Sequence, residues 1–178
     1  MEWFEEPLKR IEEEWDRVAP GLIAAQLKAH PTEQFYAAAF WLFYCDYTML
    51  GCPCLAMDSE ENFASAEPKY DRWTPPNWKF DVVDTPDALS DMYDLFEGEH
   101  DDDVWEEIME GHKQAIARVC LSVTAKARRG VDEFEGLPMH PRFVVGIFEE
   151  REGGEEYVRL AELSVAPEII GELDLPLG

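Results

Sequence analysis

The first thirty residues carry a helical repeat of apolar positions. These positions recur at steps of three and four, which places them on one helical face, while Glu and Lys occupy the other. The face is formed by Leu8, Ile11, Trp15, Val18 and Leu22. Proline in a helix interior lacks the N–H that would bond to the preceding turn, so Pro20-Gly21 predicts a break or a kink there. A shorter helix over about 22–29 is expected to follow and to end at His30-Pro31.

Residues 101–129 show the clearest helical pattern in the chain. One apolar stripe with helical periodicity is formed by Trp105, Ile108, Met109, His112, Ile116, Val119, Cys120 and Val123. The acids Asp101–Asp103 suit the positive end of the helix dipole, and the basic residues of 126–129 suit its negative end. Gly130 is a typical residue for the C-terminal cap. The pattern therefore predicts one long amphipathic helix over about 101–129.

An unbroken apolar run from Phe35 to Cys45 predicts a central strand. Its aromatic content favours a strand covered on both faces over a buried helix. Residues 47–51 then predict a turn, and residues 52–57 a returning strand. Ser59 is placed to cap a short helix that begins with Glu60, because a serine oxygen can accept a hydrogen bond from the first helical turn.

The remaining pattern predicts an antiparallel-rich sheet. The expected elements are a short strand over 79–83, a helix that starts at Thr85-Pro86, a hairpin of strands 142–149 and 156–163 with its turn at 151–154, and a short helix over about 167–173. The expected fold is α+β, a single domain over residues 1–178, with the N-terminal helix and the long helix 101–129 packed on the sheet.

Composition excludes several classes of protein. The 178 residues include 39 acids and 15 Lys or Arg, for a formal charge of −24. Binding to nucleic acid or to an anionic membrane requires positive charge, so neither partner is expected. The longest apolar run, residues 35–45, is too short to span a bilayer, and no secretory signal is recognised. With four cysteines, a cytoplasmic protein with reduced thiols is expected.

The charge is concentrated in one segment. Between Lys79 and Lys113 there is no Lys or Arg, and 13 acids fall in those 33 residues. One interpretation is a solvated acidic surface that also matches the helix dipole. The other is a docking face for a basic protein, because long-range attraction speeds association. The candidate docking residues are Asp94, Glu97, Glu99, Asp101, Asp102, Asp103, Glu106, Glu107 and Glu110.

Metal and cofactor sites are not expected. The aspartates Asp101–Asp103 point in different directions at a helix start and lack the spacing of a calcium loop. Cys52 and Cys54 form a Cys-x-Cys pair near Cys45, which can bind zinc or cycle between redox states, but no second pair at metal spacing exists. Buried structural thiols are the favoured interpretation, and a strand would place Cys52 and Cys54 on one face.

Two groups of side chains allow a rival, small-molecule site. Arg72, Trp73 and Trp78 lie in one Pro-containing loop, which either packs on the sheet with Arg72 paired to an acid or faces a ligand or partner. His112 lies on the apolar stripe, where a hydrogen-bonded core histidine is favoured over a general base. No nucleophile, phosphate-loop or zinc-protease motif is present, so an enzyme is not favoured.

The chain also resembles a known family. The residues that carry the resemblance are the run Phe35–Asp46, the segment Asp58-Ser59-Glu60-Glu61 and the loop Arg72-Trp73-Thr-Pro-Pro-Asn-Trp78. Together they resemble the bacterial domain-of-unknown-function family numbered 4303, whose members are small single-domain proteins, over roughly residues 8–163. Families of this kind accompany toxin genes, where small acidic α+β proteins act as immunity proteins, so the resemblance implies that function.

The sequence thus favours a non-enzymatic acidic binding protein. Its expected role is that of an immunity protein that neutralises a basic toxin, such as a nuclease, by occlusion. The alternatives are a small-molecule-binding protein or enzyme with a site near His112, Trp73 and Trp78, and a housekeeping interaction domain whose acids only keep it soluble.

Overall fold

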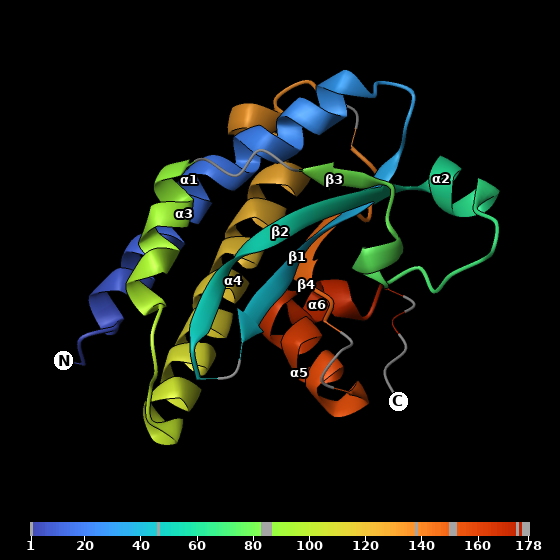
Figure 1. The fold of residues 1–178 in the computed structure, drawn as a ribbon. Coiled ribbons are helices and arrows are strands. Elements are labelled where there is room, and N and C mark those ends of the chain that lie inside the picture. The colour runs from blue at the N-terminus through green and yellow to red at the C-terminus, as the bar shows by residue number, and fades with distance from the viewer. Residues whose placement is uncertain are drawn as a thin grey trace.

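A four-stranded mixed sheet forms the centre of the molecule (Figure 1). The computed structural model describes residues 2–45, 47–82, 87–137, 139–149, 153–173 and 175. The strands are β1 (Phe35–Cys45), β2 (Met49–Ser59), β3 (Phe80–Val82) and β4 (Val144–Ile147), in the order β3-β2-β1-β4. The β1–β2 and β2–β3 pairs are antiparallel, and β4 is parallel to β1. The α+β fold class expected from the sequence is confirmed.

Helices cover the two faces of the sheet unequally. One face packs against α1 (Glu5–Ala29), α3 (Asp87–Tyr93) and α4 (Asp102–Arg129). The other face is covered in part by α5 (Gly154–Ser164), α6 (Pro167–Ile170) and the loop 72–78. The short helix α2 (Glu60–Ser65) follows β2, and the Ser59 hydroxyl accepts a hydrogen bond from the Asn62 N–H at 3.1 Å. The start of the helix expected at Thr85-Pro86 lies outside the described residues.

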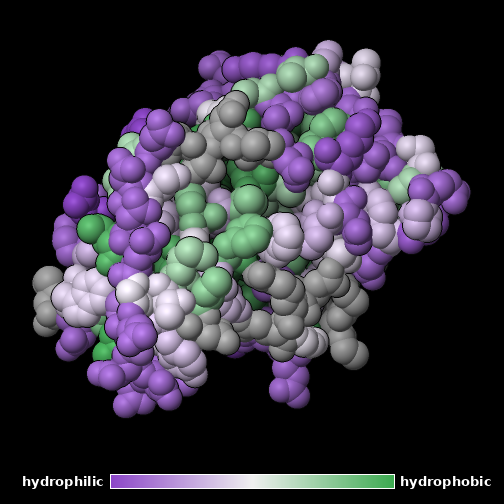
Figure 2. Space-filling view, viewed as in Figure 1, coloured by the Kyte–Doolittle hydropathy of each residue, from purple (hydrophilic) through white to green (hydrophobic). Residues whose placement is uncertain are grey.

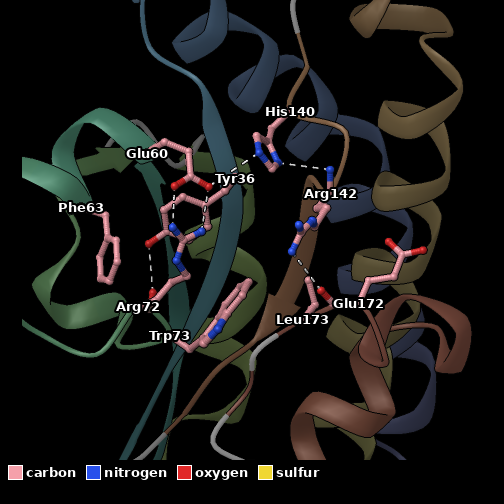
Figure 3. A pocket seen from close by; sticks show the side chains of 9 residues that line it. All are labelled: Tyr36, Glu60, Phe63, Arg72, Trp73, His140, Arg142, Glu172 and Leu173. Carbon is pink, nitrogen blue, oxygen red and sulfur yellow. Dashed lines mark hydrogen bonds and ion pairs between the residues drawn. The ribbon is translucent and has the colours of Figure 1, made fainter.

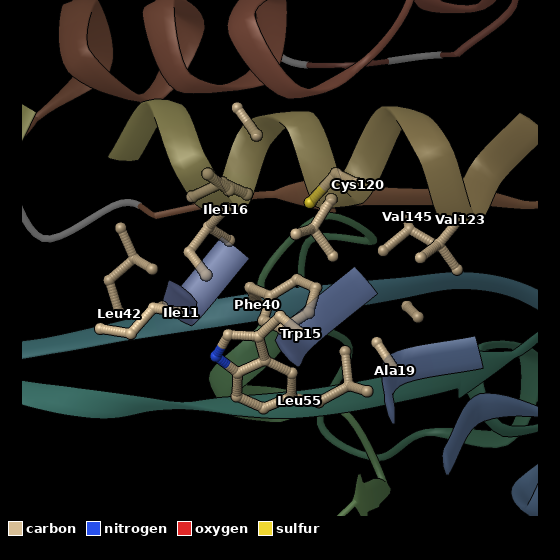
Figure 4. Packing of buried hydrophobic residues seen from close by; sticks show 14 of the residues in the cluster. Ile11, Trp15, Ala19, Phe40, Leu42, Leu55, Ile116, Cys120, Val123 and Val145 are labelled. Atoms are coloured by element: carbon tan, nitrogen blue, oxygen red, sulfur yellow. The ribbon is translucent and has the colours of Figure 1, made fainter. Parts of the chain in front are cut away.

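The first core cluster lies between α1, α4 and the sheet (Figure 4). Trp15 of α1 is fully buried and meets the ring of Phe40 edge-on, with the two centroids 4.9 Å apart. Ile116 and Cys120 of α4 point into the same cluster. The long helix therefore occupies the predicted residues, and Gly130 caps it in the left-handed conformation at φ 61°.

Of the break or kink predicted at Pro20, the break is wrong. Helix α1 continues through Pro20 to Ala29. Its buried residues on both sides of the proline, such as Ala19 and Ile23, belong to the same core cluster. Burial of one continuous apolar face outweighs the backbone cost of an interior proline, which is about 3 kcal/mol relative to alanine.

Replacing Pro20 with alanine is expected to raise the free energy of unfolding by about 1–2 kcal/mol. Alanine restores an N–H that can donate to the Asp16 carbonyl, and this gain exceeds the lost packing of the buried ring. Denaturant unfolding measures the change. Pro7→Ala is the control, because Pro7 lies in the first turn, where the N–H has no helical partner, and it should change little. A less stable Pro20→Ala protein would show that ring packing dominates.

The predicted C-terminal hairpin is also wrong. Of the two predicted strands, residues 142–149 and 156–163, only 144–147 form a strand, and this strand pairs in parallel with β1, with Ala37 opposite Val144. Residues 154–164 form helix α5 instead of a returning strand. Tyr157, Leu160 and Ala161 share one buried helical face, and the Ser164 hydroxyl accepts a hydrogen bond from the Ile147 N–H at 2.9 Å. The spacing of Tyr157, Leu160 and Ala161 at steps of three and four in the sequence indicates this helix. The predicted turn at 151–154 is described only from residue 153 onward.

No helix in the described ranges combines the length and the apolar character that a bilayer crossing needs.

Candidate functional site

The predicted acidic residues gather at one end of the molecule. They follow α3, occupy the 3-10 helix at Asp94–Phe96, and continue into the first turns of α4. Figure 2 shows hydrophilic residues over the start of α4. We call the surface of residues 94–110 the acidic end. Eight of the nine predicted residues are exposed, and the ninth, Glu110, is half-buried. A hydrogen bond from the Gly98 N–H to the Thr48 carbonyl, at 2.9 Å, ties this end to the β1–β2 hairpin.

One of the nine acids is committed to an ion pair. Glu110 binds the Arg159 guanidinium at 3.0 Å, and Arg159 also binds Glu156, which pairs with Lys113 at 2.8 Å. Hydrogen bonds from Arg159 and Lys113 lower the pKa of Glu156 to about 2. Within the described chain the other eight acids form no ion pair. These eight carboxylates therefore face solvent.

A line of aromatic rings runs through the acidic end. The Trp3 and His100 rings are stacked with centroids 5.8 Å apart, and His100 and Trp105 are stacked at the same distance. The Tyr47 ring lies 6.5 Å from that of Trp105. We call Trp3, His100, Trp105 and Tyr47 the ring ladder. The two ends of the ring ladder are exposed to solvent, since Trp3 is 51% and Tyr47 43% exposed. Leu95, five residues before His100 in the sequence, is also 51% exposed. The sequence pattern does not reveal this apolar centre, because three separate chain segments build it.

The cysteines do not form a site. Cys45 and Cys54 are exposed and Cys52 is half-buried, so the prediction of buried thiols is wrong for the first two. An irregularity in the β1–β2 register between Trp41/Cys54 and Phe43/Gly51 inserts an extra residue in β2. Cys52 consequently packs toward the α1–α4 cluster, and Cys54 is on the solvent side. No group of three metal-ligating side chains exists among the described residues, the acids of 101–103 included.

The rival site around His112 is not assembled. His112 and Cys120 are buried in the cluster between α4 and the sheet, and His112 hydrogen-bonds to the Tyr93 hydroxyl at 3.0 Å. Trp73 and Trp78 belong to the second cluster, on the opposite face. The sheet therefore separates them. Burial lowers the pKa of His112 to about 3, which is the property of a core histidine and not of a base facing a substrate.

The loop 72–78 packs against the sheet. The Trp73 and Trp78 indoles are buried against Tyr36 and Phe148. The Trp78 Nε1–H donates to the Arg72 carbonyl at 3.0 Å. The Arg72 side chain pairs with Glu60, as the packing interpretation predicts. Trp73 and Arg72 also line the wall of a cavity.

This cavity of about 420 Å³ opens at the edge where β1 begins (Figure 3). One wall contains Glu60, Arg72 and the rings of Tyr36, Phe63 and Trp73. The Arg72 guanidinium stacks over the Tyr36 ring at 4.3 Å and the Phe63 ring at 4.6 Å, and its Nη1 donates to Glu60 at 2.8 Å. Arg72 is therefore fixed in orientation and neutralised.

The opposite wall comes from a distant part of the chain. It contains His140, Arg142, Glu172 and Leu173. Because β4 is parallel to β1, the segment that precedes β4 lies beside the start of β1. The backbone N–H of Arg142 donates to His140 Nδ1 at 3.1 Å, and the Arg142 side chain points into the cavity (Figure 3). These residues were not predicted, since only the parallel pairing brings them together.

A buried polar cluster supports the first wall from behind. Asp58 is fully buried and accepts hydrogen bonds from the Tyr36 hydroxyl at 2.9 Å, the Tyr70 hydroxyl at 2.6 Å and the Asn62 amide at 2.8 Å. Burial and the nearby Asp58 raise the pKa of both tyrosines above its ordinary value. The two hydroxyls therefore remain protonated donors.

A comparison with protein-family models, with curated proteins and with solved structures finds no match to this chain. The resemblance to the family numbered 4303 therefore stays a prediction.

Proposed function

We propose that this chain is a non-enzymatic binding protein whose acidic end docks a basic protein partner. The specific form of the proposal is an immunity protein that neutralises a cationic toxin, such as a nuclease. The observation that carries it is the exposure of Trp3 and Tyr47 at the ends of the ring ladder, inside a surface of unpaired acids. An apolar centre with a charged rim is the usual arrangement of a protein-binding hot spot.

The mechanism is occlusion. A toxin that acts on nucleic acid presents a basic cleft to phosphates, and an acidic surface is attracted to the same cleft. The charge of −24 would steer the two proteins together over long range, while the ring ladder would bury its exposed edges in the complex. The cytoplasmic location expected from the sequence suits a protein that meets its toxin inside the cell.

Reversing the charge at the acidic end is expected to slow binding. We expect a variant with Asp101, Asp102 and Asp103 changed to lysine to associate with the partner at least tenfold more slowly, with a smaller change in dissociation rate. The control variant carries lysine at Glu133, Glu135 and Glu168. These acids are also exposed and give the same change in net charge away from the acidic end.

The partner is first obtained by capture on the immobilised protein at low salt, with elution in salt steps. The purified partner is then tested for inhibition of its activity by the wild-type chain, and its association rate is measured by stopped-flow mixing. Trp3→Ala is expected to raise the dissociation rate. Equal association rates for the two lysine variants would contradict docking through the acidic end. So would an association rate that does not change with salt concentration.

A further inference from the structure

The cavity beside β1 gathers positive charge in a strongly acidic protein. Arg72 and Arg142 line it, and the Arg128 guanidinium binds Glu172 of its wall at 3.3 Å. Two acids, Glu60 and Glu172, face these three arginines. Each acid already has an arginine partner, Arg72 for Glu60 and Arg128 for Glu172. Of the three arginines, Arg142 is therefore the one whose charge neither acid neutralises in an ion pair.

Arg142 is free to bind a ligand. Within the described chain its side chain forms one hydrogen bond, from Nη1 to the Glu172 carbonyl at 3.5 Å, which is long. A guanidinium has five N–H donors in a planar fork that matches a carboxylate or a phosphate. Most of these donors are unused, and the side chain points into the cavity (Figure 3).

His140 supplies a second donor on the same wall. Its Nδ1 accepts the Arg142 N–H, so the neutral ring carries its proton on Nε2. Nε2 lies 3.6 Å from the nearest Glu60 oxygen, which is beyond hydrogen-bond distance. Burial lowers the pKa of His140, Glu60 opposes this shift, and the charges of Arg142, Arg72 and Arg128 add to it. Three arginines and one carboxylate therefore act on the His140 ring.

We propose that this cavity binds a small organic oxyanion, a carboxylate or a phosphate ester, with the anionic group on Arg142 and His140. The volume of about 420 Å³ suits a small molecule. Trp73, Phe63 and Leu173 offer an apolar surface for its uncharged part. This binding is separate from the docking proposed for the acidic end and does not depend on it.

Titration of the full chain with phenyl phosphate and with benzoate tests the proposal. Two-dimensional NMR of the four histidine rings follows binding, and benzyl alcohol is the uncharged probe. We expect saturable shifts of the His140 resonances with at least one anion, and a rise in the His140 pKa in its presence. Tighter binding of phenyl phosphate than of benzoate identifies a phosphate site, and the reverse identifies a carboxylate site.

Arg142→Gln is expected to weaken this binding about ten- to hundredfold, because it removes a charge-assisted, bidentate contact. The substitution should preserve the fold, since Arg142 is exposed and its side chain forms one long hydrogen bond to the described residues. Arg10→Gln, an exposed arginine of α1 outside the cavity, is the control and should bind like the wild type. The proposal is overturned if neither anion gives a saturable shift at His140, if benzyl alcohol binds equally well, or if Arg142→Gln binds unchanged.

Discussion

Between about pH 7 and pH 5 the wild-type protein is expected to lose about 2 kcal/mol of its free energy of unfolding. Replacing His112 with glutamine is expected to remove most of this loss. His112 is fully buried on α4, and burial lowers its pKa to about 3, with the charge of Lys113 acting in the same direction. In the unfolded chain the pKa returns to the ordinary value near 6.5.

The hydrogen bonds around His112 suit the neutral ring that burial favours. The Trp15 indole can only donate, so its 3.0 Å bond to Tyr93 makes the Tyr93 oxygen an acceptor. With the ring neutral, the Tyr93 hydroxyl can donate its own proton to His112 Nε2, also at 3.0 Å. A proton on Nε2 would end that donation in the core.

The sign of the pH effect follows from these pKa values. Below about pH 6.5 His112 is protonated in the unfolded chain but stays neutral in the folded protein. The free energy of unfolding therefore falls as the pH falls, and the loss ends near pH 3. The range from pH 7 to pH 5 stays above the pI of about 4.3 and above the ordinary pKa of glutamate. Carboxylates such as Glu156, whose stabilising effect is lost at lower pH, therefore contribute little to the measurement.

Denaturant unfolding at the two pH values measures the loss. Glutamine keeps an oxygen that can accept the Tyr93 bond, so the variant should fold at both pH values. His30→Gln is the control, because His30 is not fully buried, and it should keep the wild-type pH dependence. If the His112→Gln protein loses as much stability as the wild type, the acid sensitivity has another origin.

The long helix, the central strand and the Ser59 cap could be predicted because local pattern and final packing agree there. The strand within 142–149 could be predicted too, but its partner and the helix over 156–163 could not, because so short a segment allows both a strand and a helix. This error had a consequence for the site. The expected antiparallel hairpin would not bring the loop before β4 to the start of β1, and so His140 and Arg142 were never placed near Arg72.

The acidic residues could be predicted as a group, because they are contiguous in sequence. The ring ladder could not, because Trp3, Tyr47 and His100 come from three segments that meet only after the hairpin packs against α4. Local patterns thus reveal charge that is continuous along the chain. They miss apolar contacts and cationic cavities that depend on tertiary structure.

Asp58→Ala is expected to lower the free energy of unfolding by about 3 kcal/mol. Asp58 is fully buried and accepts three hydrogen bonds, so its removal leaves a cavity and takes the acceptor away from the half-buried donors of Tyr70 and Asn62. The cost falls mainly on Tyr70 and Asn62. The Tyr36 hydroxyl still reaches the Arg72 carbonyl at 3.0 Å and keeps an acceptor there.

Asp58→Asn separates the hydrogen bonds from the volume of the side chain. Asparagine keeps one acceptor oxygen and fills the same space, and its amide can donate to a tyrosine oxygen if that hydroxyl turns. We therefore expect a loss of about 1 kcal/mol, against about 3 kcal/mol for alanine, in denaturant unfolding near neutral pH. Equal losses for the two variants would show that the carboxyl charge, and not the number of acceptors, stabilises this cluster. Since Tyr36 and Arg72 form the cavity wall, the alanine variant should also bind phenyl phosphate or benzoate more weakly than Asp58→Asn does.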